Sequence, residues 1–325
     1  MSKKRVKLYD FARALCALHI IITWHGVAYF YPDSIVIKLG TPMTIASLAC
    51  FTFLSGLFNN IKNGIASFYK SRVRRLYVPF VISYFLLVAI GLNDMNLKDS
   101  ILSLTGLSCF FGGQPNTLWY ICMLLIFYAL TPLLLFNSDR GTKEGQKKIA
   151  LKGAAIFVIF YLADRSLPYF ETRILYYFPF YVLGLILHPQ KIQIWISLKR
   201  SKYIWLFSSV VFLGLTVLLS AVAVNKATIA QLFICLSYGF WGTILFLTCS
   251  EFLSYLTYIG KILVDISYSS MFAYLFHRVI FFFCIGVLLQ FHPMVVLIVG
   301  SVLSFICSFW IQKWYDNVIN YKFKK

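Results

Sequence analysis

Ten apolar stretches, most of them close to a bilayer thickness in length, constrain the fold of this chain more than any other feature. They lie near residues 8–30, 41–58, 76–93, 118–136, 150–163, 174–189, 204–224, 229–249, 266–289 and 293–313. An α-helix needs about 20 apolar residues to cross the hydrocarbon core of a membrane. Soluble domains are only roughly 45–50% apolar, whereas this chain is 60% hydrophobic and 13% charged. We therefore predict an all-α polytopic membrane protein with about ten transmembrane helices.

Little sequence remains outside these stretches, so residues 1–325 are predicted to form a single transmembrane domain. The connection 94–117 is mixed in composition, and its apolar part ends at Gly112-Gly113. This apolar part is too short to span a bilayer, and we expect an interfacial or re-entrant segment there.

The basic residues indicate how the spans are oriented. The chain carries 30 Lys and Arg against 11 Asp and Glu, which gives a formal net charge of +19. With ten spans, both termini lie on one side, and the loops and tails of that side hold 23 of the 30 basic residues, against 5 on the other. Because Lys and Arg accumulate in cytoplasmic loops, we predict that both termini are cytoplasmic. The same bias explains the positive charge without a nucleic-acid partner.

The eight cysteines give no indication of a metal centre. They are scattered, mostly within apolar stretches, and form neither a Cys-x-x-Cys pair nor a cluster with histidines. This spacing fits neither a zinc site nor a disulfide framework. We expect no metal and no permanently bound cofactor.

The first span is unusual because it contains four ionisable residues, Asp10, Arg13, His19 and His25. Such residues are costly inside a membrane and are candidates for function. Asp10 and Arg13 are i,i+3 neighbours on a helix, so a structural ion pair near the cytoplasmic face is the alternative. A single histidine in a helix can likewise be a packing residue that forms a hydrogen bond. Their concentration in one span favours a functional role.

Two further groups of residues combine charge with a membrane setting. His277 is followed by Arg278 in the ninth stretch, where the alternative to a functional role is a pair that reaches the outer interface. Arg72 and Arg75 follow the second stretch on one predicted helical face. They either anchor a cytoplasmic loop or hold phosphate groups, because the planar guanidinium matches phosphate oxygens.

Six motifs, taken in chain order, resemble those of the integral-membrane acyltransferase family 3. They are Asp10-x-x-Arg13 with a histidine at the far end of the span, Phe51-Thr-Phe-Leu-Ser-Gly-Leu-Phe58, Tyr69-Lys-Ser-Arg-Val-Arg-Arg-Leu-Tyr-Val-Pro-Phe80, Leu118-Trp-Tyr-Ile with Tyr128-Ala-Leu-Thr-Pro132, Phe178-Pro-Phe-Tyr-Val-Leu-Gly184 and Ile266-Ser-Tyr-Ser-Ser-Met-Phe-Ala-Tyr-Leu-Phe-His277. Each motif is short and apolar, but six in order across residues 8–280 are specific together. In the second motif, Ser55-Gly56 is expected to allow close helix packing.

The resemblance implies an enzyme of the bacterial cell membrane, surrounded by membrane lipids. It would transfer an acyl group, acetyl in the subgroup that fits best, from cytoplasmic acyl-CoA to a hydroxyl of a surface polysaccharide, a lipid-linked sugar or a related glycan. The alternative is a transporter or flippase of lipid-linked sugars. Such a protein should show repeated halves with broken helices, and the sequence shows none.

The resemblance also implies roles for individual residues. His25 would act as general base or transient acyl carrier. Arg13, oriented by Asp10, would stabilise negative charge or hold the donor. Arg72 and Arg75 would bind the phosphates of coenzyme A. The candidate acceptor site comprises Trp119, Tyr120 and His277, although the two aromatic residues are equally typical of an interfacial belt.

One departure from the family pattern concerns His25. The family usually has ten residues between the arginine and the histidine of the first span, and this chain has eleven. At about 100° per residue, an unbroken α-helix would turn Arg13 and His25 onto different faces. Either a π-bulge absorbs the extra residue or the histidine faces elsewhere, in which case His19 is the fallback.

Overall fold

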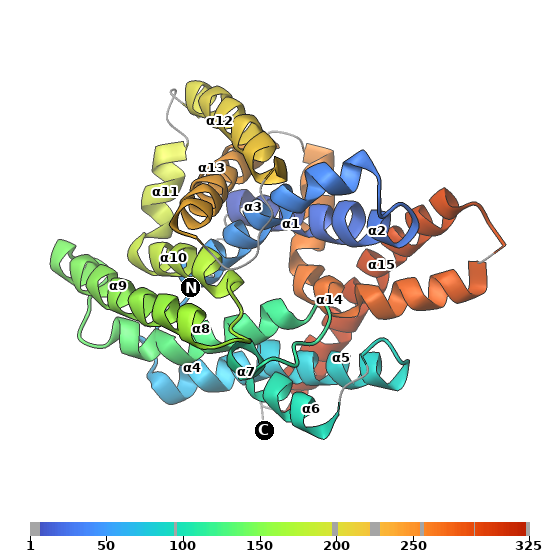
Figure 1. The fold of residues 1–325 in the computed structure, drawn as a ribbon, viewed down its shortest axis with the longest axis horizontal. Helices are drawn as coiled ribbons and strands as arrows, with labels where there is room; N and C mark the ends of the chain where they lie inside the picture. Colours follow the sequence, from blue (N-terminus) through green and yellow to red (C-terminus); the bar gives the residue numbers. More distant parts are fainter. Residues whose placement is uncertain are drawn as a thin grey trace. The chain divides into compact units, whose positions relative to one another are not determined.

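The computed structural model describes residues 7–93, 96–196, 201–221, 228–253, 257–288 and 290–322, and in these ranges all regular secondary structure is helical (Figure 1). The elements in chain order are α1 (Lys7–Leu18), the π-helix η1 (His19–Gly26), α2 (Val27–Phe30), α3 (Ile35–Leu57), α4 (Ile65–Arg72), the π-helix η2 (Val73–Tyr77), α5 (Val78–Ala89), α6 (Leu97–Thr105), α7 (Ser108–Phe111), α8 (Trp119–Leu135), α9 (Lys143–Ser166), α10 (Arg173–Ile186), α11 (Pro189–Ile196), α12 (Ser201–Ala221), α13 (Ile229–Leu253), α14 (Thr257–Leu288) and α15 (Pro293–Lys322). The predicted all-α class is confirmed.

Each of the ten apolar stretches falls largely within helices, but they differ in length. Within the described ranges, five helices are long and apolar enough to cross a membrane: Lys7–Phe30, Ile35–Leu57, Ile229–Leu253, Ile259–Leu288 and Pro293–Ile319. Three further apolar helices are shorter, Trp119–Leu135, Arg173–Ile186 and Tyr203–Leu219. The count of ten spans and the cytoplasmic placement of both termini stay predictions. Some of the basic residues in the charge comparison lie outside the described residues, namely 3–5, 199, 200, 226, 324 and 325.

The connection 94–117 contains two short helices, α6 and α7. Residues 94 and 95 lie outside the described ranges. The helices have 9 and 4 residues and are separated by Gly106, which adopts a positive φ of 78°. Neither is long enough to cross a bilayer, in agreement with the prediction that this segment does not span.

The helices pack as two compact units whose segments alternate along the chain. The first comprises residues 1–51, 195–221 and 238–325, and the second comprises residues 52–194 and 222–237. In the first unit, α14 and α15 form a long hairpin, drawn in orange and red in Figure 1, and α1 packs along α14. The π-helix η1 contacts both α14 and α15.

The core of the first unit explains how η1 is held against this hairpin. Ile21 packs in a buried cluster with Ala273, Phe281 and Leu297. A Cβ atom added at Gly26 would lie 2.7 Å from a methyl carbon of Leu297. The glycine therefore allows α15 to approach the end of η1 closely.

In the second unit, α3 and α10 approach each other through two glycines. A Cβ atom at Gly56 would overlap the carbonyl group of Tyr181, and one at Gly184 would overlap the carbonyl oxygen of Phe53. Small residues allow such backbone contact between membrane helices. The close packing predicted at Ser55-Gly56 is confirmed.

Arg140 binds the carbonyl ends of the same two helices. Its Nη1 donates to the carbonyl oxygen of Asn59 at 2.6 Å. Its Nη2 lies within hydrogen-bond distance of the carbonyl oxygens of Leu57 (3.1 Å), Gly184 (3.0 Å) and Leu187 (2.8 Å). The last carbonyls of a helix lack intrahelical partners and carry partial negative charge. A cationic donor therefore stabilises both helix ends.

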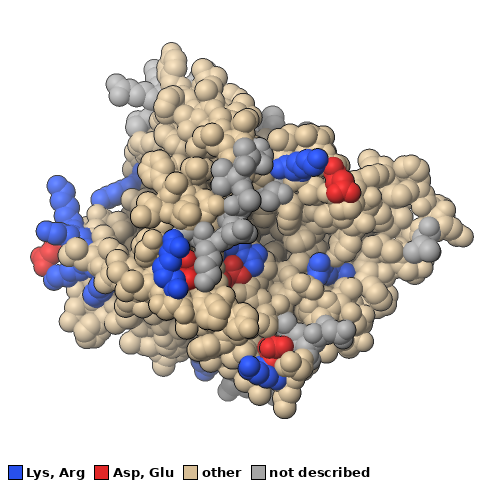
Figure 2. All heavy atoms as spheres, viewed as in Figure 1, with Lys and Arg blue, Asp and Glu red and all other residues tan. Residues whose placement is uncertain are grey.

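The surface of the molecule is apolar to an extent that suits a lipid environment. Large hydrophobic side chains such as Tyr203, Ile229 and Val287 are 74–76% exposed. The face drawn in Figure 2 is mostly uncharged, with a few separate groups of basic and acidic side chains. Monomeric soluble proteins rarely expose continuous apolar surface of this kind.

Candidate active site

The first span changes from an α-helix to a π-helix where its histidines begin. α1 ends at Leu18, and η1 runs from His19 to Gly26. A π-helix forms i→i+5 hydrogen bonds, so each of its turns holds about one residue more than an α-helical turn. The extra residue between Arg13 and His25 is therefore accommodated by the π-helix, which is the first of the two alternatives raised by the sequence.

His25 lies beside His277 of α14. The centroids of the two imidazole rings are 4.7 Å apart, and the ring planes are inclined by 36°. His277 is fully buried, whereas His25 is partly exposed. The two histidines, 252 positions apart in the sequence, thus form one pair within the first unit.

The hydrogen bonds of His277 define its tautomer. Its Nδ1 lies 2.8 Å from the carbonyl oxygen of Tyr274 and 3.2 Å from that of Ala273. Carbonyl oxygens only accept hydrogen bonds, so Nδ1 carries the proton and donates. In neutral imidazole Nε2 is then the acceptor. This atom is buried and has no hydrogen-bond partner among the described residues.

Arg278 and Tyr29 complete the surroundings of the histidine pair. Arg278 lies close enough to both histidines and to the Tyr29 hydroxyl for an electrostatic interaction. The Tyr29 ring stacks on Phe281 with a centroid distance of 5.4 Å. For Arg278 the sequence leaves open a functional role and a pair that reaches the outer interface. Its position directly after His277 was the only signal of its place at this site.

Asp10 and Arg13 lie in the other half of the first span. Asp10 is buried, and its Oδ1 accepts a hydrogen bond of 3.1 Å from the hydroxyl of Ser267 on α14. Arg13 and His25 are twelve positions apart, which corresponds to about 18 Å at the α-helical rise. Asp10 and Arg13 therefore lie on the same span as His25, but at a different level along the membrane-spanning helix.

His19 has a packing environment of its own. The hydroxyl of Thr44 donates to the carbonyl oxygen of Gly40 at 3.0 Å. Since this hydroxyl has one proton, His19 Nε2, 3.3 Å from Thr44 Oγ1, is the donor in their hydrogen bond. His19 is buried against α3, whereas His25 faces α14.

Arg72 and Arg75 have different surroundings, although the sequence treats them alike. The π-helix η2 begins at Val73 between them, so the α-helical i,i+3 spacing does not apply. The Arg72 guanidinium lies 5.2 Å from the ring centroid of Phe68 and 5.0 Å from that of Tyr128, and its Nη2 donates to Asn59 Oδ1. Arg75 is exposed.

The Asn59 side chain connects Arg72 to a buried polar network. Asn59 Nδ2 donates to the Tyr181 hydroxyl at 2.6 Å, and that hydroxyl lies 2.5 Å from Thr131 Oγ1. Asn59, Thr131 and Tyr181 are at most 1% exposed. Arg72 is therefore held in a defined orientation by the core of the second unit.

The aromatic candidates Trp119 and Tyr120 also lie in the second unit. The guanidinium carbon of Arg173 is 3.5 Å from the centroid of the Trp119 ring, and Arg173 forms a two-point ion pair with Glu171, with both N···O distances at 2.5 Å. The Tyr120 hydroxyl shares a 3.0 Å hydrogen bond with Thr52. One face of Trp119 is thus covered by a cation, and Tyr120 is buried.

Comparison with known families identifies the class of protein. A family model described as an acyltransferase domain matches residues 7–313. The chain belongs to acyltransferase family 3. No curated protein and no solved structure matches the chain. The family match covers every candidate site residue of this membrane acyltransferase and extends over both compact units. Within the described ranges, the acyltransferase has no group of three His, Cys, Asp or Glu side chains placed to hold a metal ion.

Proposed function

We propose that this acyltransferase moves an acetyl group from cytoplasmic acetyl-CoA to a hydroxyl of a cell-surface glycan or a lipid-linked sugar, with His25 as the catalytic residue. The observation that carries the proposal is the His25–His277 pair, with a centroid distance of 4.7 Å and a buried Nε2 on His277 that has no partner among the described residues. Membership of an acyltransferase family favours this function over transport of lipid-linked sugars.

In the proposed reaction His277 is a positioning residue for His25. Its Nδ1 donates to the main chain, so its Nε2 can accept a hydrogen bond from one ring nitrogen of His25. The other nitrogen of His25 is then the free acceptor, as required of a general base. A fixed hydrogen-bond acceptor serves the same purpose behind the histidine of hydrolytic triads.

The chemical steps follow from this arrangement. His25 takes the proton of the acceptor hydroxyl while the oxygen of that hydroxyl attacks the thioester carbonyl carbon. The carbon–sulfur bond then breaks, and the thiolate of coenzyme A leaves and takes up the proton from His25. Arg278, next to the histidines, is suited to stabilise the negative charge that develops on the carbonyl oxygen.

The other charged candidates fit donor binding better than the acyl-transfer step. Arg13, about 18 Å along the helix from His25, would hold the donor rather than stabilise the oxyanion, with Asp10 orienting it. Arg75 is exposed and free to approach a phosphate, whereas Arg72 shares its guanidinium with Asn59. Trp119 and Tyr120 remain candidates for contact with the acceptor sugar.

Mass spectrometry of surface glycans tests the proposed function. Cells that express the wild-type protein should carry glycans heavier by one acetyl unit than cells without the gene. His25→Ala should abolish this difference, because general-base catalysis contributes roughly 10²–10⁴-fold. His19→Ala is the matched control within the same π-helix and should retain the modification. An unaltered glycan in wild-type cells would overturn the proposed reaction, and full activity of His25→Ala would overturn the catalytic assignment.

A further inference from the structure

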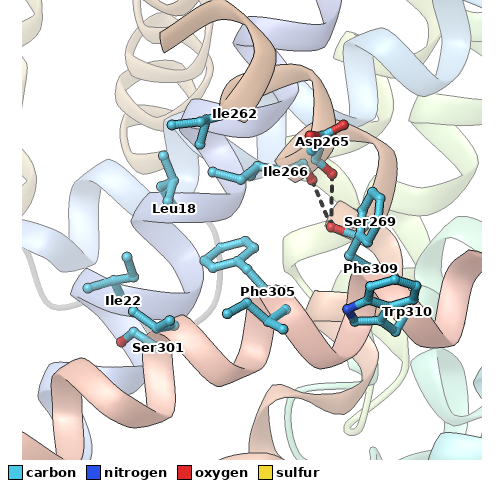
Figure 3. Close-up of a pocket in the computed structure, with 12 residues that line it drawn as sticks. Leu18, Ile22, Ile262, Asp265, Ile266, Ser269, Ser301, Phe305, Phe309 and Trp310 are labelled. Atoms are coloured by element: carbon cyan, nitrogen blue, oxygen red, sulfur yellow. Dashed lines mark hydrogen bonds between the residues drawn. The ribbon is translucent and has the colours of Figure 1, made fainter. Parts of the chain in front are cut away.

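A groove of about 440 Å³ lies along three helices of the first unit (Figure 3). One wall is formed by Leu18 and Ile22 at the junction of α1 and η1, and the others by α14 and α15. From Trp310 to Ser301 the groove follows nine residues of α15, or about 13 Å at the helical rise. Its volume is within the range of small-molecule binding sites.

Two polar residues, Ser301 and Asp265, interrupt the apolar lining without a side-chain partner among the described residues. Ser301 is 4% exposed, and its hydroxyl has no hydrogen-bond partner among the described residues. Asp265 also lines the groove and is partly exposed, and no described side chain pairs with its carboxylate. The nearby Ser269 hydroxyl bonds main-chain oxygens instead, as the dashed lines in Figure 3 show. An unpaired buried polar group such as the Ser301 hydroxyl is costly, and a hydrocarbon chain would form a hydrogen bond with neither Ser301 nor the partly exposed Asp265.

The two ends of the groove differ in their surroundings. Trp310 is 59% exposed, and the ammonium of Lys313 lies 5.0 Å from the centroid of its ring. Exposed Trp and Lys side chains together are typical of a membrane interface, which is the cytoplasmic one in the predicted orientation. At the other end, Ile22 precedes the catalytic candidate His25 by three residues.

We infer that this groove binds the pantetheine arm of the acyl-CoA donor, an inference that rests on the proposed function. The arm is slender, uncharged and largely aliphatic. It also carries amide N–H groups, and Asp265 can accept hydrogen bonds from them. A thioester at its tip would reach the level of Ser301, whose hydroxyl can donate to the thioester carbonyl. Lys261 and Lys313, both exposed beyond the Asp265 end, are suited to the pyrophosphate that directly precedes the arm, which leaves the 3′-phosphate for another basic residue.

Disulfide trapping tests where the tip of the arm lies. Ser301→Cys places a thiol beside the expected position of the thioester, and the purified full-length protein is treated with the disulfide form of coenzyme A. The introduced thiolate attacks one sulfur of the probe, a mixed disulfide forms, and one coenzyme A thiolate leaves. Intact-protein mass spectrometry should show one added coenzyme A, at a rate that saturates with probe concentration and falls when acetyl-CoA is present.

Leu303→Cys is the matched control, because Leu303 is exposed on the same helix and does not line the groove. We expect Ser301→Cys to react at least roughly tenfold faster than Leu303→Cys and than the wild-type protein with its native cysteines. Equal rates, or no protection by acetyl-CoA, would overturn the inference and leave a groove filled by bilayer lipid. Acetyl-CoA binding to the wild-type protein, measured by calorimetry, separates the two proposals. Binding without selective trapping refutes only the groove assignment, whereas absence of binding refutes the proposed donor.

Discussion

The contrast between Arg72 and Arg75 gives the sharpest test of how this structure uses its basic residues. Replacing Arg72 by alanine removes a charge-assisted hydrogen bond to Asn59, which contributes about 1.5–3 kcal/mol. It also removes the contacts with the rings of Phe68 and Tyr128, about 0.5–1 kcal/mol each at partly exposed sites. Water can rehydrate part of the vacated space, so we expect a loss of about 3 kcal/mol in the free energy of unfolding.

Thermal unfolding in detergent, followed by intrinsic fluorescence, measures this difference. A loss of about 3 kcal/mol lowers the unfolding midpoint by roughly 6–12 °C in chains of 150–250 residues, and we expect a shift of that order for Arg72→Ala. Arg75→Ala changes an exposed side chain and should alter stability by at most about 0.5 kcal/mol. Equal midpoints for the two variants would refute the assignment of Arg72 to the buried network.

Donor binding by the same two variants separates a structural role from a functional one. If Arg75 holds a phosphate, Arg75→Ala should weaken acyl-CoA binding roughly ten- to a hundredfold while its midpoint is unchanged. Unchanged affinity would leave Arg75 only the role of a cytoplasmic anchor. For Arg72→Ala, donor affinity must be compared with that of the wild type at temperatures well below the lowered unfolding midpoint. Only a folded variant that binds the donor more weakly indicates that Arg72 contacts a phosphate.

Three further predictions concern other parts of the molecule. His277→Asn keeps a donor for the main-chain carbonyl but removes Nε2. Acetylation should therefore fall by at least about 10²-fold while protein abundance is preserved. Normal acetylation by this variant would refute the positioning role of His277. Arg140→Ala deprives four carbonyl groups of their partner and should lower the free energy of unfolding by about 4 kcal/mol or more, which a midpoint close to that of wild type would contradict. For topology, an impermeant maleimide added to intact cells should label Asp33→Cys but not Asn63→Cys, and the reverse pattern would invert the predicted orientation.

The helices could be predicted from the sequence because a bilayer leaves the backbone few choices. An apolar segment must satisfy its main-chain hydrogen bonds internally, and a helix achieves this. All ten apolar stretches are therefore helical, whatever their length. Which of them cross the membrane is less well determined, since helices such as Arg173–Ile186, with 14 residues, fall below the length of a full span.

The composition of the candidate site was predictable only in part. His25 and His277 stood out because an ionisable residue within an apolar stretch is conspicuous in any sequence. Their contact was not predictable, because it depends on the packing of η1 against α14. The burial of Arg72 was hidden for a related reason. It depends on Asn59, which the sequence places in an ordinary loop and the structure places in a buried hydrogen-bond network.

The π-helix in the first span leads to a prediction that separates local geometry from sequence spacing. If η1 absorbs one extra residue, deleting Thr23 should convert it to an α-helix with the spacing usual in the family, while the histidine keeps its orientation. Deleting Leu15 gives the same spacing between Arg13 and His25, but Leu15 lies within the regular helix α1, so its deletion should rotate the buried residues Cys16 and Ala17 by about 100° out of their packing. Both side chains are partly exposed, so the two deletions are otherwise comparable. We expect acetylation to survive the Thr23 deletion within about tenfold and to be lost in the Leu15 deletion, with both proteins quantified in the membrane. Loss of acetylation in both, at normal abundance, would mean that the π-helix itself and not merely the direction of His25 is required.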